Sequence, residues 1–486
     1  MAETHSPLER RLAAEHRTLA RPLRTLVRKA PVKCDERCAV GEAAARMRAE
    51  GVGSIVILGE RDRPLGILTE RDLVSIVADG GAARPVAEVM TRDPLALPGH
   101  APAYEAALAM VERRIRHVLV LEGETLIGVV SERDLFSLQR LGLGELTMEI
   151  RLARDVPAIG GLAERVRRLA RLLVEEGVAA DPLTLFVSVL NDRIAQRIIE
   201  VVRKRHRWER VGWCWLAFGS EGRLEQTFAT DQDNGLVFEA QDGARPAAVR
   251  AKLVPFAREV NEALDACGYP LCRGNVMASN PELCLSGGEW RAKLKGWLEN
   301  TDPKALLDAA ICFDFRAIAG DARLAAELRE WFLGVTRVRR NFLRLMAANA
   351  LQAKPPLGVV RDFATEGTPN APGTVNVKMH GLRVFVDAAR ILALAHGLPQ
   401  TNTAERLRAA AAAGALPPDE AAATVAAFSF VQGIRLRHQA ALDSFADDAA
   451  NRIDPAQLNE LDRRTLKEAF RIARDLQSRL ALDYQL

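Results

Sequence analysis

The chain repeats the stretch Gly66-Ile67-Leu68-Thr69-Glu70-Arg71-Asp72-Leu73 as Gly128-Val129-Val130-Ser131-Glu132-Arg133-Asp134-Leu135. The residues before each copy follow one pattern: apolar positions at helical spacing, a short β-branched run, a polar turn and a second apolar run. Such self-similarity is typical of duplicated supersecondary units, so we expect two copies of one small α/β unit. The predicted helices are 40–50 and 103–113, and the predicted strands are 54–58, 65–68, 117–121 and 126–130.

A second pattern lies in the middle of the chain, where residues 211–218 form an aromatic-rich run that predicts a strand. This run ends in Gly219-Ser220, and Thr230-Asp231-Gln232-Asp233-Asn234 follows. Residues i and i+2 of a strand point to one face, so a strand that bears Asp231 and Asp233 can present both carboxylates to shared metal ions. Magnesium prefers such hard oxygen ligands together with substrate phosphates. A solvated turn is the alternative interpretation of the two aspartates.

The N-terminal repeat resembles a tandem pair of CBS domains, the Bateman module, over about residues 28–145. The resemblance implies an adenine-nucleotide site in each copy, formed by Thr69 and Asp72 and then by Ser131 and Asp134. A hydroxyl beside a helix N-terminus adds a donor to the free N–H groups that attract phosphate, and a carboxylate suits a ribose diol. Simple N-capping by Thr69 and Ser131 is the alternative, and one of the two sites being empty is also open.

The Gly-Ser turn with the paired aspartates resembles the signature of the nucleotidyltransferase superfamily. More closely, residues 219–223 and 230–234 are similar to the bacterial DUF294 family, in which a nucleotidyltransferase-like domain is joined to CBS modules. That family is related to the uridylyl- and adenylyltransferases of nitrogen signalling, and it ends in a helical substrate-binding domain. The other stretches that fit it are 269–272, 276–281, 289–291, 313–316, 403–407, 435–439 and 466–470, with Lys378 and Arg390.

The resemblance implies roles for the residues of this motif. Gly219 lets the backbone approach the triphosphate of an NTP, Ser220 donates a hydrogen bond to it, and Asp231 and Asp233 hold Mg²⁺. An acceptor oxygen then attacks the α-phosphorus in line with the departing pyrophosphate, which requires positioning more than covalent chemistry from the protein.

Asp314 is the candidate for a third catalytic carboxylate and metal ligand. It stands between Phe313 and Phe315, and an acidic side chain among large apolar ones is costly to bury without a cation. A salt bridge to Arg316 or to another basic residue is the alternative.

Four basic residues are candidates for binding substrate. Arg223 has a planar fork that suits bidentate contact with phosphate, although Glu225 could pair with it instead or cap a helix. The resemblance adds Lys378, and Arg435 and His438 could hold the acceptor or the nucleotide. A solvated helix face explains Arg435 and His438 equally well, and His438 by itself suggests a structural histidine more than a catalytic one.

Composition limits the possible partners and location. The 486 residues exceed the ~250 to 300 that one hydrophobic core supports, so several domains are expected. The net charge of +4 gives no indication of nucleic acid or anionic lipid, and no apolar run approaches the ~18 residues of a membrane span. Seven scattered cysteines without a CxxC pair disfavour a disulfide framework and a four-cysteine zinc site. We therefore expect a cytoplasmic protein with neither a membrane nor a nucleic-acid partner.

We predict a multidomain α/β plus α fold: a tandem CBS (Bateman) module, a nucleotidyltransferase-like α/β domain and a C-terminal helical bundle. The apolar residues Leu162, Val166, Leu169, Leu172 and Leu173 predict one face of a helix before the transferase-like domain, which could transmit a signal or simply pack. The predicted parts are an N-terminal extension (1–27), the CBS pair (28–145), a helical linker (146–207), the transferase-like domain (208–335) and the helical substrate-binding domain (336–486).

Three functions of different classes are compatible with the sequence. The leading hypothesis is a Mg²⁺-dependent signal-transduction enzyme that transfers a nucleoside monophosphate from an NTP to an unidentified acceptor, under control of adenine nucleotide at the CBS pair. The alternative is a non-catalytic module that senses nucleotide or binds a protein, and a structural adaptor is a weaker third. The resemblance also allows a protein as the acceptor and a homodimer formed through the CBS domains.

Overall fold

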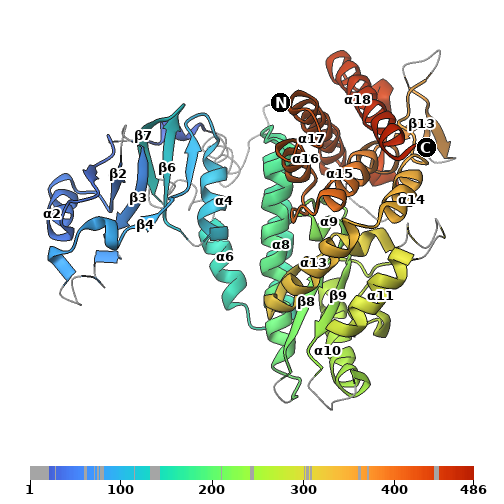
Figure 1. Ribbon diagram of the computed structural model, residues 1–486, viewed down its shortest axis with the longest axis horizontal. Helices are drawn as coiled ribbons and strands as arrows, with labels where there is room; N and C mark the ends of the chain where they lie inside the picture. The colour runs from blue at the N-terminus through green and yellow to red at the C-terminus, as the bar shows by residue number, and fades with distance from the viewer. Residues whose placement is uncertain are drawn as a thin grey trace, which may run out of the picture. The chain divides into compact units, whose positions relative to one another are not determined.

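The chain forms two compact units (Figure 1). The first ends at Met148 and the second begins at Glu149. In the described part of the chain, no helix is long and apolar enough to cross a membrane. The computed structural model describes residues 21–27, 29–59, 63–70, 72–73, 76, 81–113, 115–131, 143–208, 211–240, 246–299, 302, 306, 309–358, 363–368, 371–442 and 448–486.

The first unit contains two small sheets that repeat one topology. In each sheet a short strand pairs in parallel with the strand that follows a helix, and that strand forms an antiparallel hairpin with the next. Parallel neighbours require such a crossover, which the two predicted helices provide. The first sheet is β1 (Lys33–Asp35), β2 (Ser54–Leu58), β3 (Pro64–Thr69) and β4 (Thr91–Arg92), with α2 (Val40–Glu50); the second is β5 (Ala96–Pro98), β6 (His117–Glu122) and β7 (Thr125–Ser131), with α4 (Ala103–Arg113).

The duplicated α/β unit predicted from the repeat is confirmed. Both helices begin and end where their apolar periodicity does, and the four predicted strands agree with the structure to within about one residue at most ends. The two sheets share a small apolar cluster of Val56, Ile67, Leu119 and Leu126. The unit also contains η1 (Leu23–Thr25), η3 (Gly81–Ala83) and η4 (Val86–Glu88), and α6 (Leu143–Leu152) spans the boundary between the units.

The segment 146–207, predicted as a helical linker, is helical and lies mostly within the second unit. Helices α7 (Val156–Glu175) and α8 (Ala180–Arg203) pack against each other and against helices α10 (Pro246–Ala266) and α17 (Pro418–Ala440). The apolar face predicted for α7 is buried at Leu162, Val166, Leu169 and Leu173. Burial of this face within the second unit is the behaviour of an ordinary packed helix.

A four-stranded mixed sheet lies at the centre of the second unit. Its order is β10 (Cys284–Ser286), β9 (Asn234–Phe238), β8 (Trp213–Ala217) and β11 (Arg316–Gly320), with only β9 and β10 parallel. Both β8 and β9 are almost entirely buried, because helices cover the sheet. Figure 1 shows helices α10, α11 (Gly287–Glu299) and α13 (Ala322–Thr336) around these strands.

The C-terminal region is helical, as predicted, and shares its core with the sheet. One continuous apolar cluster extends from Cys214 and Phe218 of the sheet region, through Phe313 and Phe385, to Leu480 near the C-terminus. The remaining elements are α9 (Gly219–Gly222), η5 (Pro281–Leu283), η6 (Ala310–Phe313), α14 (Arg340–Ala350), β12 (Glu366–Thr368), β13 (Ala371–Asn376), η7 (Lys378–Leu382), α15 (Arg383–His396), α16 (Thr403–Ala412), η8 (Asp448–Asn451), β14 (Arg452–Ile453), η9 (Pro455–Gln457) and α18 (Glu460–Tyr484).

Candidate active site

The two aspartates of the central motif lie together at the start of β9. They precede this strand rather than belonging to it, because regular pairing with β8 begins at Asn234, opposite Ala217. The segment is nevertheless held beside β8, since the Phe218 N–H donates to the Asp233 carbonyl at 2.8 Å. One carboxylate oxygen from Asp231 and one from Asp233 lie within 4.8 Å of each other. The prediction that these carboxylates share a site is therefore supported by their geometry.

Gly219 brings the main chain close to this pair. It has a φ of +54°, and a Cβ at this position would lie 3.1 Å from Asp233 Oδ2 and 2.9 Å from a side-chain carbon of Ile311. Only glycine avoids both the strained backbone and the crowding. Ser220, the next residue, is partly exposed on the single turn of α9. The Gly-Ser turn thus lies beside the aspartates, where phosphate oxygens could approach the backbone.

Buried amides hold the aspartate segment in place. Gln232 donates through Nε2 to the carbonyls of Asn261 and Tyr269, at 2.9 and 2.7 Å, and accepts from Asn261 Nδ2 at 2.7 Å. Asn234 accepts from Asn261 Nδ2 at 3.0 Å, and its own N–H donates to the Val276 carbonyl at 3.0 Å. These bonds fix the backbone on both sides of Asp233 and so hold the segment that carries the two aspartates. The polar residue between the aspartates therefore has a structural role.

The charges around the aspartates come from both halves of the second unit. Burial, and then the negative charge of Asp231, raise the pKa of Asp233 to about 7, while Lys378 and Arg223 act in the opposite direction. Desolvation, and then the charge of Arg435, lower the pKa of Lys378, although the residue as a whole is exposed. Burial lowers the pKa of Arg435 to about 10, and Asp231 opposes that shift. The two aspartates therefore lie in one electrostatic environment with Lys378 and Arg435 of the C-terminal region.

One carboxylate oxygen of Asp233 has no hydrogen-bond partner among the described residues. Asp233 is 7% exposed, yet its Oδ1 atom is buried without a hydrogen bond in the described part of the chain. An unpaired carboxylate oxygen is costly to bury, so it calls for a cation or another ligand. The donor set of two carboxylates accordingly fits a divalent cation.

Cys272 is the third potential ligand beside Asp231 and Asp233. Its Sγ lies within 4.8 Å of an oxygen of each aspartate, in a loop between α10 and η5. Burial, and then the charge of Asp233, raise the pKa of the Cys272 thiol to about 11. Cys272 belongs to the stretch 269–272 that resembles the DUF294 family, but nothing in the sequence predicts a role for it. Its distance to the aspartates and its partial exposure distinguish it from the other cysteines.

Asp314 lies in a different place, inside a cluster of arginines. Its side chain is completely buried and accepts from Arg390 Nη2 at 2.7 Å and from Arg223 Nη1 at 2.8 Å, while Arg406 Nη2 lies 2.7 Å from its Oδ1. Burial alone would raise the pKa of Asp314, but the charges of Arg390, Arg406 and Arg223 hold it well below its usual range. This is the salt-bridge alternative, although the partners are these arginines and not Arg316. We do not propose Asp314 as a metal ligand.

Arg223 and Glu225 connect the motif to the C-terminal helices. Arg223 donates through Nε to Glu225 at 2.7 Å, in addition to its bond with Asp314. The other oxygen of Glu225 accepts from the Thr403 N–H at 2.7 Å, and Asn402 donates to the Arg223 carbonyl at 3.2 Å. Glu225 therefore does both things foreseen for it, pairing with Arg223 and capping α16. The carboxylates of Glu225 and Asp314 already hold the Arg223 guanidinium. A phosphate could therefore bind Arg223 only by sharing this guanidinium with them.

A further acid on the turn was not foreseen. Burial, and then the negative charge of Asp192, raise the pKa of Glu221 to about 8, against the influence of Arg316. Arg316 pairs bidentately with Asp192 at 2.7 and 2.8 Å and also donates to the Glu221 carbonyl. Helix α8 thus contributes Asp192 to the site's surroundings, although the sequence suggested only a linker there.

The two candidate residues of α17, Arg435 and His438, both contact the segment that contains η8. Arg435, on α17, donates to Asn451 Oδ1 at 2.8 Å, and His438 Nε2 lies 2.9 Å from the Ala449 carbonyl. The contact of His438 is structural, in agreement with the alternative stated for it.

The CBS residues lie in the first unit. Thr69 Oγ1 and N–H both donate to Asp72 Oδ2, at 2.7 and 2.9 Å. This contact orders the turn after β3 and joins the two residues predicted to meet phosphate and ribose. Ser131 occupies the equivalent end of β7, while Asp134 lies outside the described residues.

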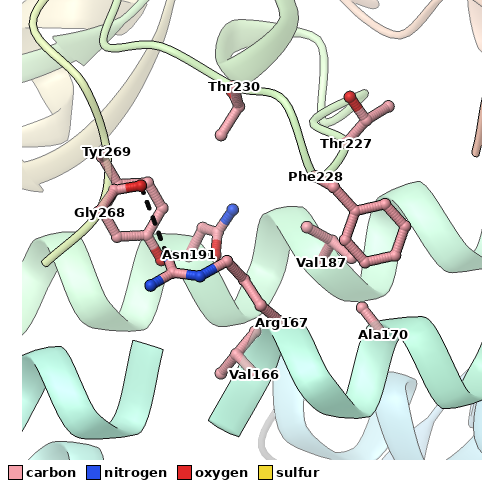
Figure 2. Close-up of a pocket in the computed structure, with 10 residues that line it drawn as sticks. All are labelled: Val166, Arg167, Ala170, Val187, Asn191, Thr227, Phe228, Thr230, Gly268 and Tyr269. Carbon is pink, nitrogen blue, oxygen red and sulfur yellow. Dashed lines mark hydrogen bonds between the residues drawn. The ribbon is translucent and has the colours of Figure 1, made fainter. Parts of the chain in front are cut away.

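A small cavity lies next to the aspartate segment, between α7, α8 and two loops (Figure 2). Thr230, which directly precedes Asp231, and Tyr269 line it, and Figure 2 shows Arg167 reaching toward the Gly268 carbonyl. The Tyr269 hydroxyl donates to Asn191 Oδ1 at 2.8 Å. The cavity has room for about one water molecule, so it cannot accept a nucleotide.

Comparison with known families assigns most of the chain. Residues 23–79 and 86–140 match the CBS domain, residues 164–304 match the family described as "Putative nucleotidyltransferase DUF294", and residues 340–484 match the "Putative nucleotidyltransferase substrate binding domain". The transferase match begins within α7, so it includes most of the segment predicted as a linker.

Individual relatives match shorter parts. An uncharacterized protein of Methanopyrus kandleri is 36% identical over 104 residues, 20% of this chain and 52% of that protein. Hypoxic response protein 1 of Mycobacterium tuberculosis is 32% identical over 96 residues, 19% of this chain and 67% of the relative. The chain thus spans about half the length of the first of these relatives. A solved CBS domain protein of Pyrobaculum aerophilum, complexed with AMP, is 27% identical, with a TM-score of 0.24 over 25% of this chain and 98% of that one.

Proposed function

From the membership of this chain in the CBS-pair proteins that carry the DUF294 nucleotidyltransferase and substrate-binding domains, we propose that it is a divalent-metal-dependent nucleotidyltransferase. It would transfer a nucleoside monophosphate from an NTP to an acceptor that the site does not identify. The observation that carries the proposal is the convergence of Asp231 and Asp233 beside the Gly219 turn, with the Asp233 Oδ1 atom buried and without a hydrogen bond among the described residues.

The chain's own residues divide the task. Asp231 and Asp233 would hold the cation, and the backbone at Gly219 and the hydroxyl of Ser220 would receive phosphate oxygens. When bound, a divalent cation supplies charge stabilisation for the entering and leaving oxygens. Lys378 and Arg435 would bind the polyphosphate and stabilise its charge, since both lie in the electrostatic environment of the aspartates.

The arrangement of the unit supports this division. Acids come from the sheet region and cations from η7 and α17, and one apolar core holds these elements together. Buried partners such as the Gln232–Asn261 amide pair keep the acids in place before any ligand arrives. Such preorganisation avoids reorganisation cost during the reaction.

The test is transfer of label from each α-labelled NTP, with a divalent cation, to the protein itself, to small molecules and to lysate fractions. Asp231→Asn and Asp233→Asn should each abolish transfer, because either change removes a ligand charge while preserving shape. Asp475→Asn on α18 is the matched control, since that residue is exposed and distant in sequence. Measurable NTP binding without transfer to any acceptor would instead favour a non-catalytic nucleotide-sensing module.

For the first unit we propose binding of an adenine nucleotide that regulates the transferase. The contact between Thr69 and Asp72 supports this proposal, because it places a hydroxyl and a carboxylate together after β3. Isothermal calorimetry with AMP, ADP and ATP measures it directly.

A further inference from the structure

We propose that Cys272 is the third protein ligand of the metal site, and that the site therefore prefers a borderline divalent cation such as Zn²⁺ or Co²⁺ over Mg²⁺. The inference rests on the proposed role of Asp231 and Asp233 as metal ligands. It adds a sulfur ligand to a site that would otherwise contain oxygen alone.

The first argument is geometric. An oxygen of Asp231, an oxygen of Asp233 and the Sγ of Cys272 lie within 4.8 Å of one another, close enough for one ion to contact all three. A second observation, independent of the cysteine, also indicates a metal site: Asp233 Oδ1 is buried and has no hydrogen-bond partner in the described part of the chain. A cation would contact this oxygen and the Cys272 sulfur at once.

The second argument concerns the loop that carries Cys272. The loop is tied to the aspartate segment on both sides: the Gln232 N–H donates to the Pro270 carbonyl, and the Asn234 N–H donates to the Val276 carbonyl, each at 3.0 Å. The Asn275 N–H closes the turn onto the Cys272 carbonyl at 2.9 Å. The bonds that hold the aspartates therefore also hold Cys272 opposite them, and such supporting bonds orient the ligands of a metal site.

The third argument is the contrast with the other cysteines. Of the seven in the chain, Cys272 is the one that is partly exposed, and the other six are buried. A buried cysteine usually serves as a small apolar side chain, whereas this one lies at an accessible acidic group. Accessibility gives a metal ion a path to the sulfur.

Ligand chemistry then selects the metal. Mg²⁺ takes oxygen ligands in octahedral geometry, whereas Zn²⁺ and Co²⁺ accept sulfur and carboxylate together. On binding, the Cys272 thiol loses its proton to solvent as the sulfur–metal bond forms. Water or NTP phosphate would complete the coordination.

Cobalt provides a readout that is independent of catalysis. The chelator-treated full chain is titrated with Co²⁺ without NTP, and a near-ultraviolet thiolate-to-cobalt charge-transfer band is expected. The band should vanish in Cys272→Ser and persist in Cys267→Ser, because the Cys267 sulfur lies 3.6 Å from the Val156 carbonyl and is no part of the aspartate group. Asp233→Asn should weaken Co²⁺ binding while the chain stays folded by circular dichroism.

Competition measures the preference. Zn²⁺ should displace Co²⁺ at far lower concentration than Mg²⁺ does, and Cys272→Ser should reduce the Zn²⁺ to Mg²⁺ affinity ratio by roughly 10- to 100-fold or more, since losing a ligand costs at least as much as losing its support. Metal should also slow modification of Cys272 by a thiol reagent.

Three outcomes separate the proposals. Cobalt binding without the band, or a band unchanged in Cys272→Ser, would overturn the sulfur ligand and leave Cys272 as a mere neighbour of Asp233. Mg²⁺-dependent transfer without any Zn²⁺ or Co²⁺ preference would overturn this inference but support the transferase. A cysteine-dependent band without transfer to any acceptor would support the metal site and count against the transferase.

Discussion

Replacing Asp314 by asparagine should destabilise the second unit far more than an ordinary loss of charge. The substitution keeps the shape of the side chain but removes the negative charge that Arg223, Arg390 and Arg406 share at 2.7 to 2.8 Å. Arg223 and Arg390 each keep a second acidic partner, whereas Arg406 is 0% exposed and pairs with no other acid in the described part of the chain, so water cannot compensate its charge. Removing one partner of a buried ion pair typically costs ~3 to 5 kcal/mol, and we expect a loss of that size here.

The assay is urea unfolding followed by circular dichroism, with the slope m compared between variants. The matched control is Glu468→Gln, because the pair of Glu468 with Arg471 is 59% and 48% exposed and should contribute less than ~0.5 kcal/mol. In the Asp314→Asn background, Arg406→Met should restore stability, because it removes an unpaired buried cation. In the native background the same change should destabilise.

The pH dependence gives a second check. The pKa of Asp314 is held well below 3.8, so its stabilising effect is fully present above that value and is lost only as the pH falls through the lowered pKa. The difference between native chain and Asp314→Asn should therefore stay constant from about pH 5 to 8. A loss below ~1 kcal/mol at unchanged m would refute the idea that this cluster holds the sheet region to the C-terminal helices.

Three further predictions concern other parts of the molecule. Saturating adenine nucleotide at 100 times Kd should stabilise the chain by ~2.7 kcal/mol, and Thr69→Ala or Asp72→Ala should remove the effect; no heat and no shift in Tm with AMP, ADP or ATP would contradict it. Nucleotide at the CBS pair should change NTP affinity about 5- to 150-fold, and titrations in Asp72→Ala/Asp134→Ala should show no such change; equal affinities in the native chain would mean that the units are uncoupled. The raised pKa of Glu221, about 8, means that the folded state holds a proton that the unfolded state releases near 4.5, so stability falls as the pH rises between these values. Glu221→Gln should reduce that fall in urea titrations at pH 5 and 8, and an unchanged pH dependence would show that Glu221 does not cause it.

The sequence alone determined the features that depend on neighbouring residues. Helical spacing predicted α2 and α4, and the β-branched runs predicted β2 and β6, because periodicity and turn residues act over a few positions. Asp231 and Asp233 could be paired for the same reason, since the extended chain alternates its side chains. Their displacement from β9 was missed because strand ends depend on the partner strand, here β8.

Tertiary structure decided which distant residues meet. Asp314 could be recognised as a buried acid that needs a cation, but its partners Arg390 and Arg406 stand on helices α15 and α16, which pack against each other and meet Asp314 only in the folded unit. Cys272 likewise reaches the aspartates through backbone bonds between two loops. Charge and burial restrict the kind of partner a residue requires, whereas the packing of a shared core selects the partner itself, because many basic side chains in the sequence would satisfy the same local requirement.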